Sequence, residues 1–447
     1  MNPDLDKVFP HSSETARALE NFPVSLSRWS RVFYEALATV KLACLHVNHD
    51  LGYIDNERFD SLDAVLKEMR SGRYFEYFVT DPHQGGAGTS VNMNINEIAS
   101  FFASERTGAD AGIDPYEHVN LHQSTNDVFP SAVRIAMLSY LPKLENALNS
   151  LVCSLQKKES EFAHVVKIGR TELTAAVACT LGMEFGAYAQ ALSRDRWRVF
   201  KASERIRQVN LGGTAIGTGI SAPRQYILTV SSRLREITGF PVSRSENLFD
   251  STMNHDDLSE AFSMIKVVAI NLEKIASDLR LMHLLGEIVL PAMQTGSTVM
   301  PGKVNPVIPE MVSSVAKKVL SSETLINRCL SAGELELNAF LPLAAHTIFE
   351  DLELLIQAVS LFETKCINGF SAHSDLCLRN LLFSPSAATV LVFRYGYNTA
   401  RKVADYMTVN NVDIYEAVNS TGISSVSEVE NLLSPKSVLA LGSRVEQ

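Results

Sequence analysis

The sequence predicts a mainly helical protein built on long helical rods. Leucines recur at helical spacing through residues 144–155, and apolar residues recur in the same way through 348–362. Residues 258–285 contain neither Gly nor Pro, and apolar side chains fall at seven-residue intervals there. At 1.5 Å per residue this makes a rod of roughly 40 Å. Two-residue alternation, which is typical of strands, is hardly seen. Rods of this length with several apolar faces usually pack in a bundle shared between subunits.

The flanks of this helical middle have a different composition. The first ~120 residues mix short helical stretches with loop signals such as DPHQGGAG at 81–88. From about residue 369 the helical runs are shorter and richer in Ser and Asn, which is consistent with a small C-terminal domain. A chain of 447 residues exceeds what one compact core usually serves, so two or three domains are expected.

Charge and cysteine usage exclude several classes of protein. The net charge of -10 argues against nucleic acid or an anionic membrane as the main partner, since either needs a basic face. The six cysteines are scattered without CxxC pairs, which indicates reduced thiols in a cytoplasmic protein. The N-terminus lacks the pattern of a secretory signal, and no apolar run approaches the ~20 residues that span a bilayer.

The segment richest in polar and glycine residues is GSTVMPGKVNP at 296–306. Its two prolines and two glycines cannot continue a helix, so the sequence predicts a loop between the rod ending near 285 and a helix beginning near 307. Plain helix connections are usually short and lack a hydroxyl pair set a few residues from a lysine. We therefore interpret this loop as functional.

This loop resembles the GSSxMPxKxNP signature of the fumarase/aspartase superfamily, and four further segments resemble other motifs of that family in the expected order. They are QGGAGTSVNMN at 84–94, HVN at 118–120 with QSTND at 123–127, GRT at 169–171 with LGMEF at 181–185, and LGGTAIGTG at 211–219. The resemblance runs from about residue 14 to the C-terminus. The sequences of the GGAGTSVNMN and STND motifs most resemble those of aspartate ammonia-lyases, with class II fumarases next.

The resemblance implies an all-α fold with three domains. These are an N-terminal mixed helical domain at 1–120, a central helical-bundle domain at 121–368 and a small C-terminal helical domain at 369–447. In the family, four central bundles form a twenty-helix core in a homotetramer, and each site gathers segments from three subunits. No organic cofactor is expected, and no dedicated metal site.

Removing a proton beside a carboxylate is difficult, so the enzyme must stabilise a doubly charged aci-carboxylate. The resemblance places four hydroxyl donors around it: Thr89, Ser124, Thr125 and Thr298. Lys303, Asn305 and Thr171 are expected to hold the other carboxylate. The resemblance also assigns the base to Ser297, with its alkoxide stabilised by backbone N–H groups of the loop and by Lys303. From the residues alone, a serine that only hydrogen-bonds its own loop is an equal alternative.

The sequence departs from the family pattern in two places. Glu172 stands where the family commonly carries His or Gln, and a carboxylate there, with Asn126 as companion, favours an amine over water as the leaving group. The stretch 279–287 is shorter than the family's arginine- and glycine-containing connection. Glu310 is expected to act as a supporting acid, although its histidine partner is replaced by Glu172. His118, in the HVN segment, is assigned a supporting role. With His122 it could also form a metal pair, but no third ligand is evident.

We therefore expect a lyase that eliminates ammonia, or a substituted amine, from L-aspartate or a similar amino dicarboxylate to give fumarate. A fumarate hydratase and a lyase for N-substituted aspartates are alternatives in the same superfamily. A non-catalytic relative that keeps the fold is the alternative from another class. The expected partners are a small dicarboxylate and other copies of the chain, with neither nucleic acid nor membrane.

Overall fold

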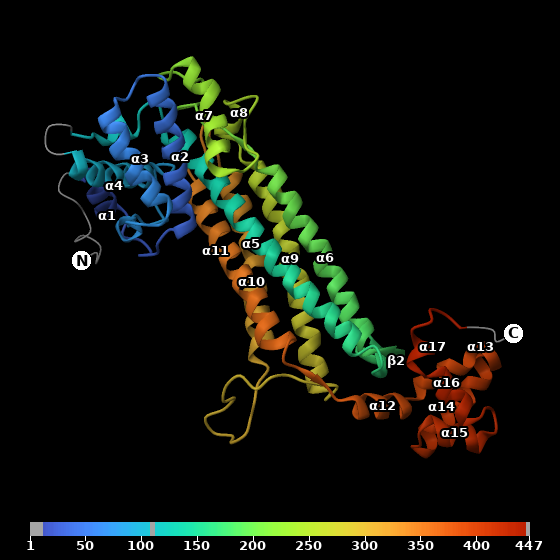
Figure 1. Ribbon diagram of the computed structural model, residues 1–447. Helices are drawn as coiled ribbons and strands as arrows, with labels where there is room; N and C mark the ends of the chain where they lie inside the picture. Colours follow the sequence, from blue (N-terminus) through green and yellow to red (C-terminus); the bar gives the residue numbers. More distant parts are fainter. Residues whose placement is uncertain (1–11, 108–111, 444–447) are drawn as a thin grey trace. The chain divides into compact units, whose positions relative to one another are not determined.

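The computed structural model describes residues 12–107 and 112–443, and it is mainly helical, as the sequence predicts (Figure 1). The predicted rod at 258–285 is α9, Asp256–Leu284, and the helix expected near 307 is α10, Val307–Leu330. The other long helices are α5 (Thr125–Glu161), α6 (Leu181–Arg205) and α11 (Leu341–Phe362). Strands in the described residues form three short two-stranded sheets.

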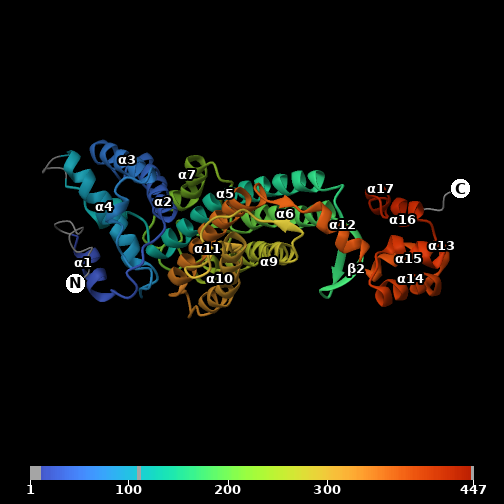
Figure 2. The same ribbon diagram turned by 90° about the horizontal axis from the view of Figure 1, so that it is seen from below.

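The described residues divide into two compact units. Unit 1 comprises the residues up to Asn146, Trp197–Ala269 and Lys317–Ile356, and unit 2 comprises Ala147–Arg196, Ile270–Ala316 and the residues from Gln357 onward. Each unit therefore contains consecutive stretches of the same long helices, which lie side by side in both views (Figures 1 and 2). The three-domain division at 120 and 368 stays a prediction.

Unit 1 contains longer helices near the N-terminus than the short stretches we expected. The helices before α5 are α1 (Ser13–Asn21), α2 (Arg31–Asp50), α3 (Asn56–Arg70) and α4 (Thr89–Thr107), with a 3-10 turn η2 (Phe75–Tyr77) and a π-helical turn η4 (Pro115–Val119). Helix α2 is buried on nearly every face, from Phe33 to Asn48. A helix that is buried on nearly every face has no single apolar stripe, so hydrophobic periodicity does not mark its full length.

The rest of unit 1 includes two further helices and a short two-stranded sheet. Helix α7 (Arg224–Thr238) packs against α2, and the short helix α8 (Asp250–Met253) precedes α9. Strands β3 (Gln208–Val209) and β4 (Ser243–Arg244) pair in parallel. This pairing brings the segment that precedes LGGTAIGTG against the connection after α7.

Unit 2 carries an antiparallel hairpin of β1 (Val166–Thr171) and β2 (Thr174–Thr180), which we did not predict. Val166 and Ile168 of β1 share a hydrophobic core with the C-terminal helices, and β1 packs against helix α12 (Ser374–Leu382), which lies by the hairpin in both views (Figures 1 and 2). A second pairing joins β5 (Ile288–Val289) to β6 (Ser371–Ala372). The C-terminal part therefore holds the hairpin that carries Thr171.

The elements after α11 are short. They are η5 (Glu363–Ile367), α12 (Ser374–Leu382), η6 (Pro385–Leu391), α13 (Val392–Tyr395), α14 (Tyr397–Asn410), α15 (Ile414–Thr421), α16 (Val426–Leu432) and α17 (Pro435–Val438). Within the described residues no single helix has both the length and the apolar character to cross a membrane; Ser374–Leu382 and Pro385–Tyr395, bent by 77°, meet the criterion only as a pair.

Candidate active site

The signature loop 296–306 lies between β5 and α10 and closes on itself. The backbone N–H of Gly296 donates to the carbonyl of Lys303 at 2.9 Å, and the Asn305 Nδ2 donates to the carbonyl of Gly296 at 2.9 Å. A Cβ at position 296 would lie 2.6 Å from the Lys303 carbonyl oxygen, so only glycine fits. These contacts make Asn305 a residue that also shapes the loop, which the sequence did not reveal.

Ser297 is half-buried inside this loop, and its hydroxyl oxygen is surrounded by donors. Oγ accepts the backbone N–H of Val299 at 3.1 Å and that of Met300 at 2.9 Å. Two N–H groups directed at one oxygen stabilise negative charge on it, which is what an alkoxide base requires. Thr298 and Lys303 are exposed on the same loop. The structure thus brings Ser297, Thr298, Lys303 and Asn305 together on one element.

Thr171 and Glu172 lie at the tip of the β1–β2 hairpin. Thr171 pairs with Thr174, which leaves Glu172 and Leu173 as the two turn residues, at φ 53° and 62°. A two-residue turn of this hand needs positive φ at both positions, and Asn-Gly is the usual solution. Glu and Leu adopt it at a cost of order 1–3 kcal/mol per residue, a strain that clusters at functional sites. The turn exposes the Glu172 side chain.

A cluster of four charged residues, of which Lys167 and Glu287 are buried, holds this hairpin in unit 2. Lys167 Nζ donates to the Glu184 carboxylate at 2.9 Å and lies 2.6 Å from Glu287 Oε2. Arg170 Nη1 donates to Glu287 Oε1 at 2.6 Å, and Glu287 is completely buried. Burial lowers the pKa of Lys167, but the carboxylates of Glu184 and Glu287 outweigh burial and raise it above its ordinary value. The sequence alone does not predict this cluster. Its one indication is Glu287, an acidic residue directly before the apolar run IVLP at 288–291.

In unit 1, Thr89 begins helix α4 after a glycine-rich turn. Its hydroxyl donates to the Gly86 carbonyl at 2.8 Å, and Gly86, Ala87 and Gly88 all have positive φ. A Cβ on Gly88 would lie 2.5 Å from the Phe129 ring, so this glycine allows the turn to approach α5. Thr89 is therefore exposed at a helix N-terminus, where backbone N–H groups favour an anion.

Asp127 ties two motif segments together in unit 1. Its Oδ1 accepts the Ser124 N–H at 3.0 Å, and its Oδ2 accepts the N–H groups of Gly212 and Thr214 at 3.0 and 3.1 Å. Burial raises the pKa of Asp127 to about 6, against the effect of these donors. The QSTND segment is thereby fixed against LGGTAIGTG. Asp127 was quoted within a motif, but its anchoring role was not foreseen.

The remaining polar residues of QSTND have defined places at the start of α5. The Ser124 Oγ accepts the Asn126 N–H at 3.1 Å, and Thr125 is the first residue of the helix. The Asn126 Nδ2 donates to the Ala215 carbonyl at 2.8 Å. Asn126 therefore donates at least one amide hydrogen to the LGGTAIGTG loop, which Asp127 also binds.

The HVN segment lies at the π-helical turn η4. His118 Nδ1 accepts the Asp114 N–H at 2.8 Å, and burial lowers the pKa of His118. Asn120 Oδ1 accepts from the buried Lys41 at 2.9 Å, and burial lowers the pKa of Lys41 to about 7. The segment is thus fixed through a buried lysine that sequence reasoning did not single out.

Glu310 lies in the first turn of α10 within unit 2, and its carboxylate is 3.7 Å from Arg280. The described residues contain no group of three or more His, Cys, Asp or Glu side chains able to hold a metal ion. The predicted residues therefore fall into two sets. Those of the first set lie in unit 1: Thr89, His118, Ser124, Thr125 and Asn126. Those of the second lie in unit 2: Thr171, Glu172, Ser297, Thr298, Lys303, Asn305 and Glu310.

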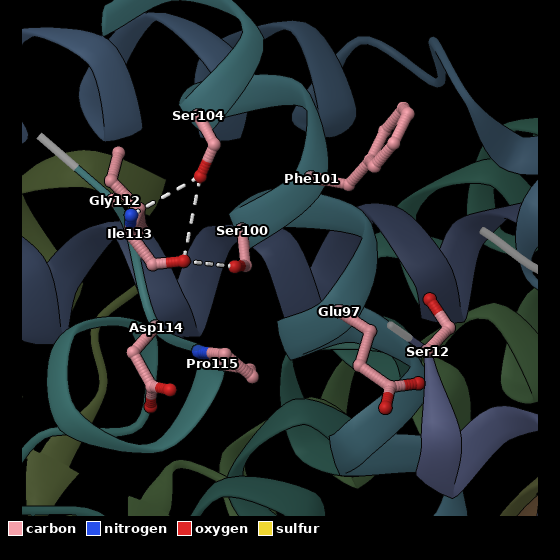
Figure 3. Close-up of a pocket in the computed structure, with 9 residues that line it drawn as sticks. All are labelled: Ser12, Glu97, Ser100, Phe101, Ser104, Gly112, Ile113, Asp114 and Pro115. Carbon is pink, nitrogen blue, oxygen red and sulfur yellow. Dashed lines mark hydrogen bonds between the residues drawn. The ribbon is translucent and has the colours of Figure 1, made fainter. Parts of the chain in front are cut away.

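A cavity of about 430 Å³ beside α4 contains none of these residues (Figure 3). Figure 3 shows Ser100 and Ser104 directed at Ile113, whose carbonyl accepts from Ser100 and whose N–H donates to Ser104 Oγ at 3.2 Å. The Glu97 carboxylate accepts two backbone N–H groups of α1 at 3.0 Å. The side chains of Glu97, Ser100 and Ser104 are thus engaged in hydrogen bonds that hold the fold.

Comparison with known proteins identifies the class. The family described as Lyase matches residues 8–321. The chain is 37% identical to an aspartate ammonia-lyase of Bacillus sp. over 97% of this chain and 94% of that one, and 35% identical to the Escherichia coli K12 aspartate ammonia-lyase over 95% and 91%.

Solved structures of the same superfamily resemble this chain in fold. A fumarate lyase:delta crystallin from Brucella melitensis bound to cobalt superposes with a TM-score of 0.89 at 37% identity, covering 94% of both chains. The class II fumarase of Schistosoma mansoni gives 0.90 at 27% identity, covering 98% of this chain and 97% of that one. Fold and motifs together define a mainly helical lyase. The chain belongs to the lyase family of the fumarase/aspartase superfamily.

Proposed function

We propose that the chain eliminates ammonia, or a substituted amine, from L-aspartate or an aspartate-like amino dicarboxylate and releases fumarate. Relatives named aspartate ammonia-lyase, matched over nearly the whole chain, support the reaction. The observation that carries the proposal is the pair of backbone N–H groups directed at Ser297 Oγ. A serine that only braces its own loop makes the same two contacts, so the activity of Ser297→Ala decides between the two roles.

In the proposed reaction, Ser297 takes a proton from the carbon next to one carboxylate. The charge that develops on this carboxylate is stabilised by the hydroxyls of Thr89, Ser124, Thr125 and Thr298. The hydrogen bonds from these donors strengthen as negative charge builds up on the carboxylate, so they stabilise the doubly charged intermediate more than the substrate. The carbon–nitrogen bond then breaks, and the amine leaves.

The rest of the site is proposed to orient the substrate. Lys303 supplies fixed positive charge to the second carboxylate, and Asn305 and Thr171 supply directional hydrogen bonds. Glu172 and Asn126 are proposed to hold the nitrogen, with His118 and Glu310 in supporting roles. The strained turn supports this role for Glu172, because an exposed carboxylate is held there at the cost of two positive φ angles.

We further propose a cytoplasmic homotetramer with three domains per chain and sites built from three subunits. In such an oligomer, a site completed by neighbouring copies can use hydroxyls from one chain and the base from another. A size measurement in solution tests this. A monomer that still turns over aspartate would contradict it.

The reaction is tested by following the ultraviolet absorbance of fumarate with the purified chain. L-Aspartate and L-malate are supplied in turn. We expect fumarate from aspartate, because Glu172 attracts an ammonium and gives no advantage to a neutral hydroxyl. Fumarate from malate alone would make the chain a hydratase. Fumarate from neither of these nor from an N-substituted aspartate, with a folded oligomer present, would favour the non-catalytic relative.

A further inference from the structure

A cavity of about 530 Å³ lies beside the hairpin turn, entirely within unit 2. Its volume is in the range that holds small ligands. Glu172 and Leu173 of the turn form one side, and Leu281, Leu284 and Leu285 from the end of α9 form the other. The two places where the sequence departs from the family pattern, position 172 and the short connection 279–287, therefore line the same cavity.

The cations around this cavity are all paired. Lys167 and Arg170 contact Glu287, and Lys274 donates to Asp278. Among the described residues, the Glu172 carboxylate receives no hydrogen bond and forms no ion pair, so the lining holds one carboxylate more than it holds cations. A positively charged group fits beside Glu172, because it would balance this charge.

The wall next to Glu172 is apolar. Leu173 and Leu284 are 78% and 79% exposed and Leu285 is 40% exposed, so a cluster of leucines faces open space within the cavity. Exposed leucines gathered next to a charged group suit a ligand that joins a cation to a hydrocarbon part. Ammonia offers only the cation and leaves the leucines in water.

We infer that the site takes aspartates whose nitrogen carries an alkyl or arylalkyl substituent, with the secondary ammonium at Glu172 and the substituent against the leucines. This inference rests on the proposed function. The base removes the proton from the carbon, the new carbon–carbon double bond forms, and the electron pair of the carbon–nitrogen bond goes to nitrogen. The products are fumarate and a neutral primary amine, which takes a proton from water.

The test compares fumarate release from N-butyl-L-aspartate and from L-aspartate by the full-length chain. We expect kcat/KM to be at least about tenfold higher for the butyl compound, since each methylene in an apolar pocket adds discrimination. Leu285→Trp fills the cavity and should lower the ratio of the two kcat/KM values by about tenfold or more. Glu172→Gln removes the charge that receives the ammonium and should lower kcat/KM for the butyl compound.

The matched control is Leu228→Trp, at a half-exposed leucine of α7 outside this cavity. It should leave the ratio as in the wild type. Thermal unfolding and circular dichroism check that each variant is folded. If Leu285→Trp does not fold, Leu281→Met, which changes shape at constant volume, takes its place with a smaller expected fall in the ratio.

The outcomes separate the two proposals. Fumarate from aspartate with little or none from the butyl compound overturns the inference and leaves the proposed function standing. A ratio that Leu285→Trp does not change also overturns the inference. Fumarate from neither compound overturns both. Preference for the butyl compound that depends on Leu285 and Glu172 supports the inference.

Discussion

The guanidinium of Arg170 lies 2.6 Å from the buried carboxylate of Glu287. The two residues are 117 positions apart, and the contact fixes strand β1 to the short segment that leads into the signature loop. Glu287 also pairs with Lys167, so one carboxylate serves two cations. Strand β1, which leads into the turn with Thr171 and Glu172, is therefore held in place by ion pairs with the buried Glu287.

Glu287→Gln removes the shared carboxylate charge from this cluster. We expect the free energy of unfolding to fall by about 3 kcal/mol, because breaking a buried ion pair leaves its partner uncompensated. Urea unfolding measures the change. The control is Asp405→Asn, which breaks an exposed pair with Arg401 and should change little. Equal effects of the two substitutions would show that burial of the cluster adds nothing.

Gly296→Ala tests the closed form of the signature loop. The new Cβ would meet the Lys303 carbonyl oxygen at 2.6 Å, so the backbone that carries Ser297 and Lys303 must shift. We expect kcat/KM for fumarate formation to fall by about a hundredfold, as a displacement near 1 Å can cause. Gly112→Ala is the control, since its Cβ meets nothing within 4 Å. Retained activity in Gly296→Ala would mean that the loop works in another conformation.

His255 gives a prediction for the pH dependence of stability. Burial, aided by the positive charge of Arg134, lowers the pKa of His255 from 6.5 to about 3. Between these values the unfolded chain binds a proton that the folded chain does not, so stability falls as the pH drops from 6.5 toward 3. The Tm of the wild type should therefore fall more steeply in this window than that of His255→Leu. The exposed His164, changed to Gln, should leave the slope unaltered.

The long helices could be predicted from the sequence because their signals are local. The absence of Gly and Pro through 258–285 predicts α9 within two residues, and the prolines and glycines of 296–306 predict its loop. The β1–β2 hairpin could not be predicted in this way. Its turn residues are Glu172 and Leu173, which carry none of the Asn-Gly signal that marks such turns.

The sequence motifs predict the residues of the candidate site. The buried residues that hold these motif segments in place depend on contacts between distant parts of the chain, which the motifs do not reveal. Asp127 binds Gly212 and Thr214, and Lys41 binds Asn120, each across many positions of the chain. No periodicity or spacing in the sequence reports such pairs. The two N–H donors to Ser297 are local, but they depend on a backbone conformation that the residue types allow without requiring it.

Ser297 is the residue proposed to take the proton from the substrate carbon. The measurement is the rate of fumarate release from saturating substrate by Ser297→Ala, beside Ser321→Ala at an exposed serine of α10 as control. We predict that Ser297→Ala loses at least about a hundredfold in kcat with oligomer size and substrate binding nearly unchanged, while Ser321→Ala matches the wild type. A Ser297→Ala variant that keeps more than about a tenth of the wild-type kcat would contradict the account, because the proton would then be taken by another group.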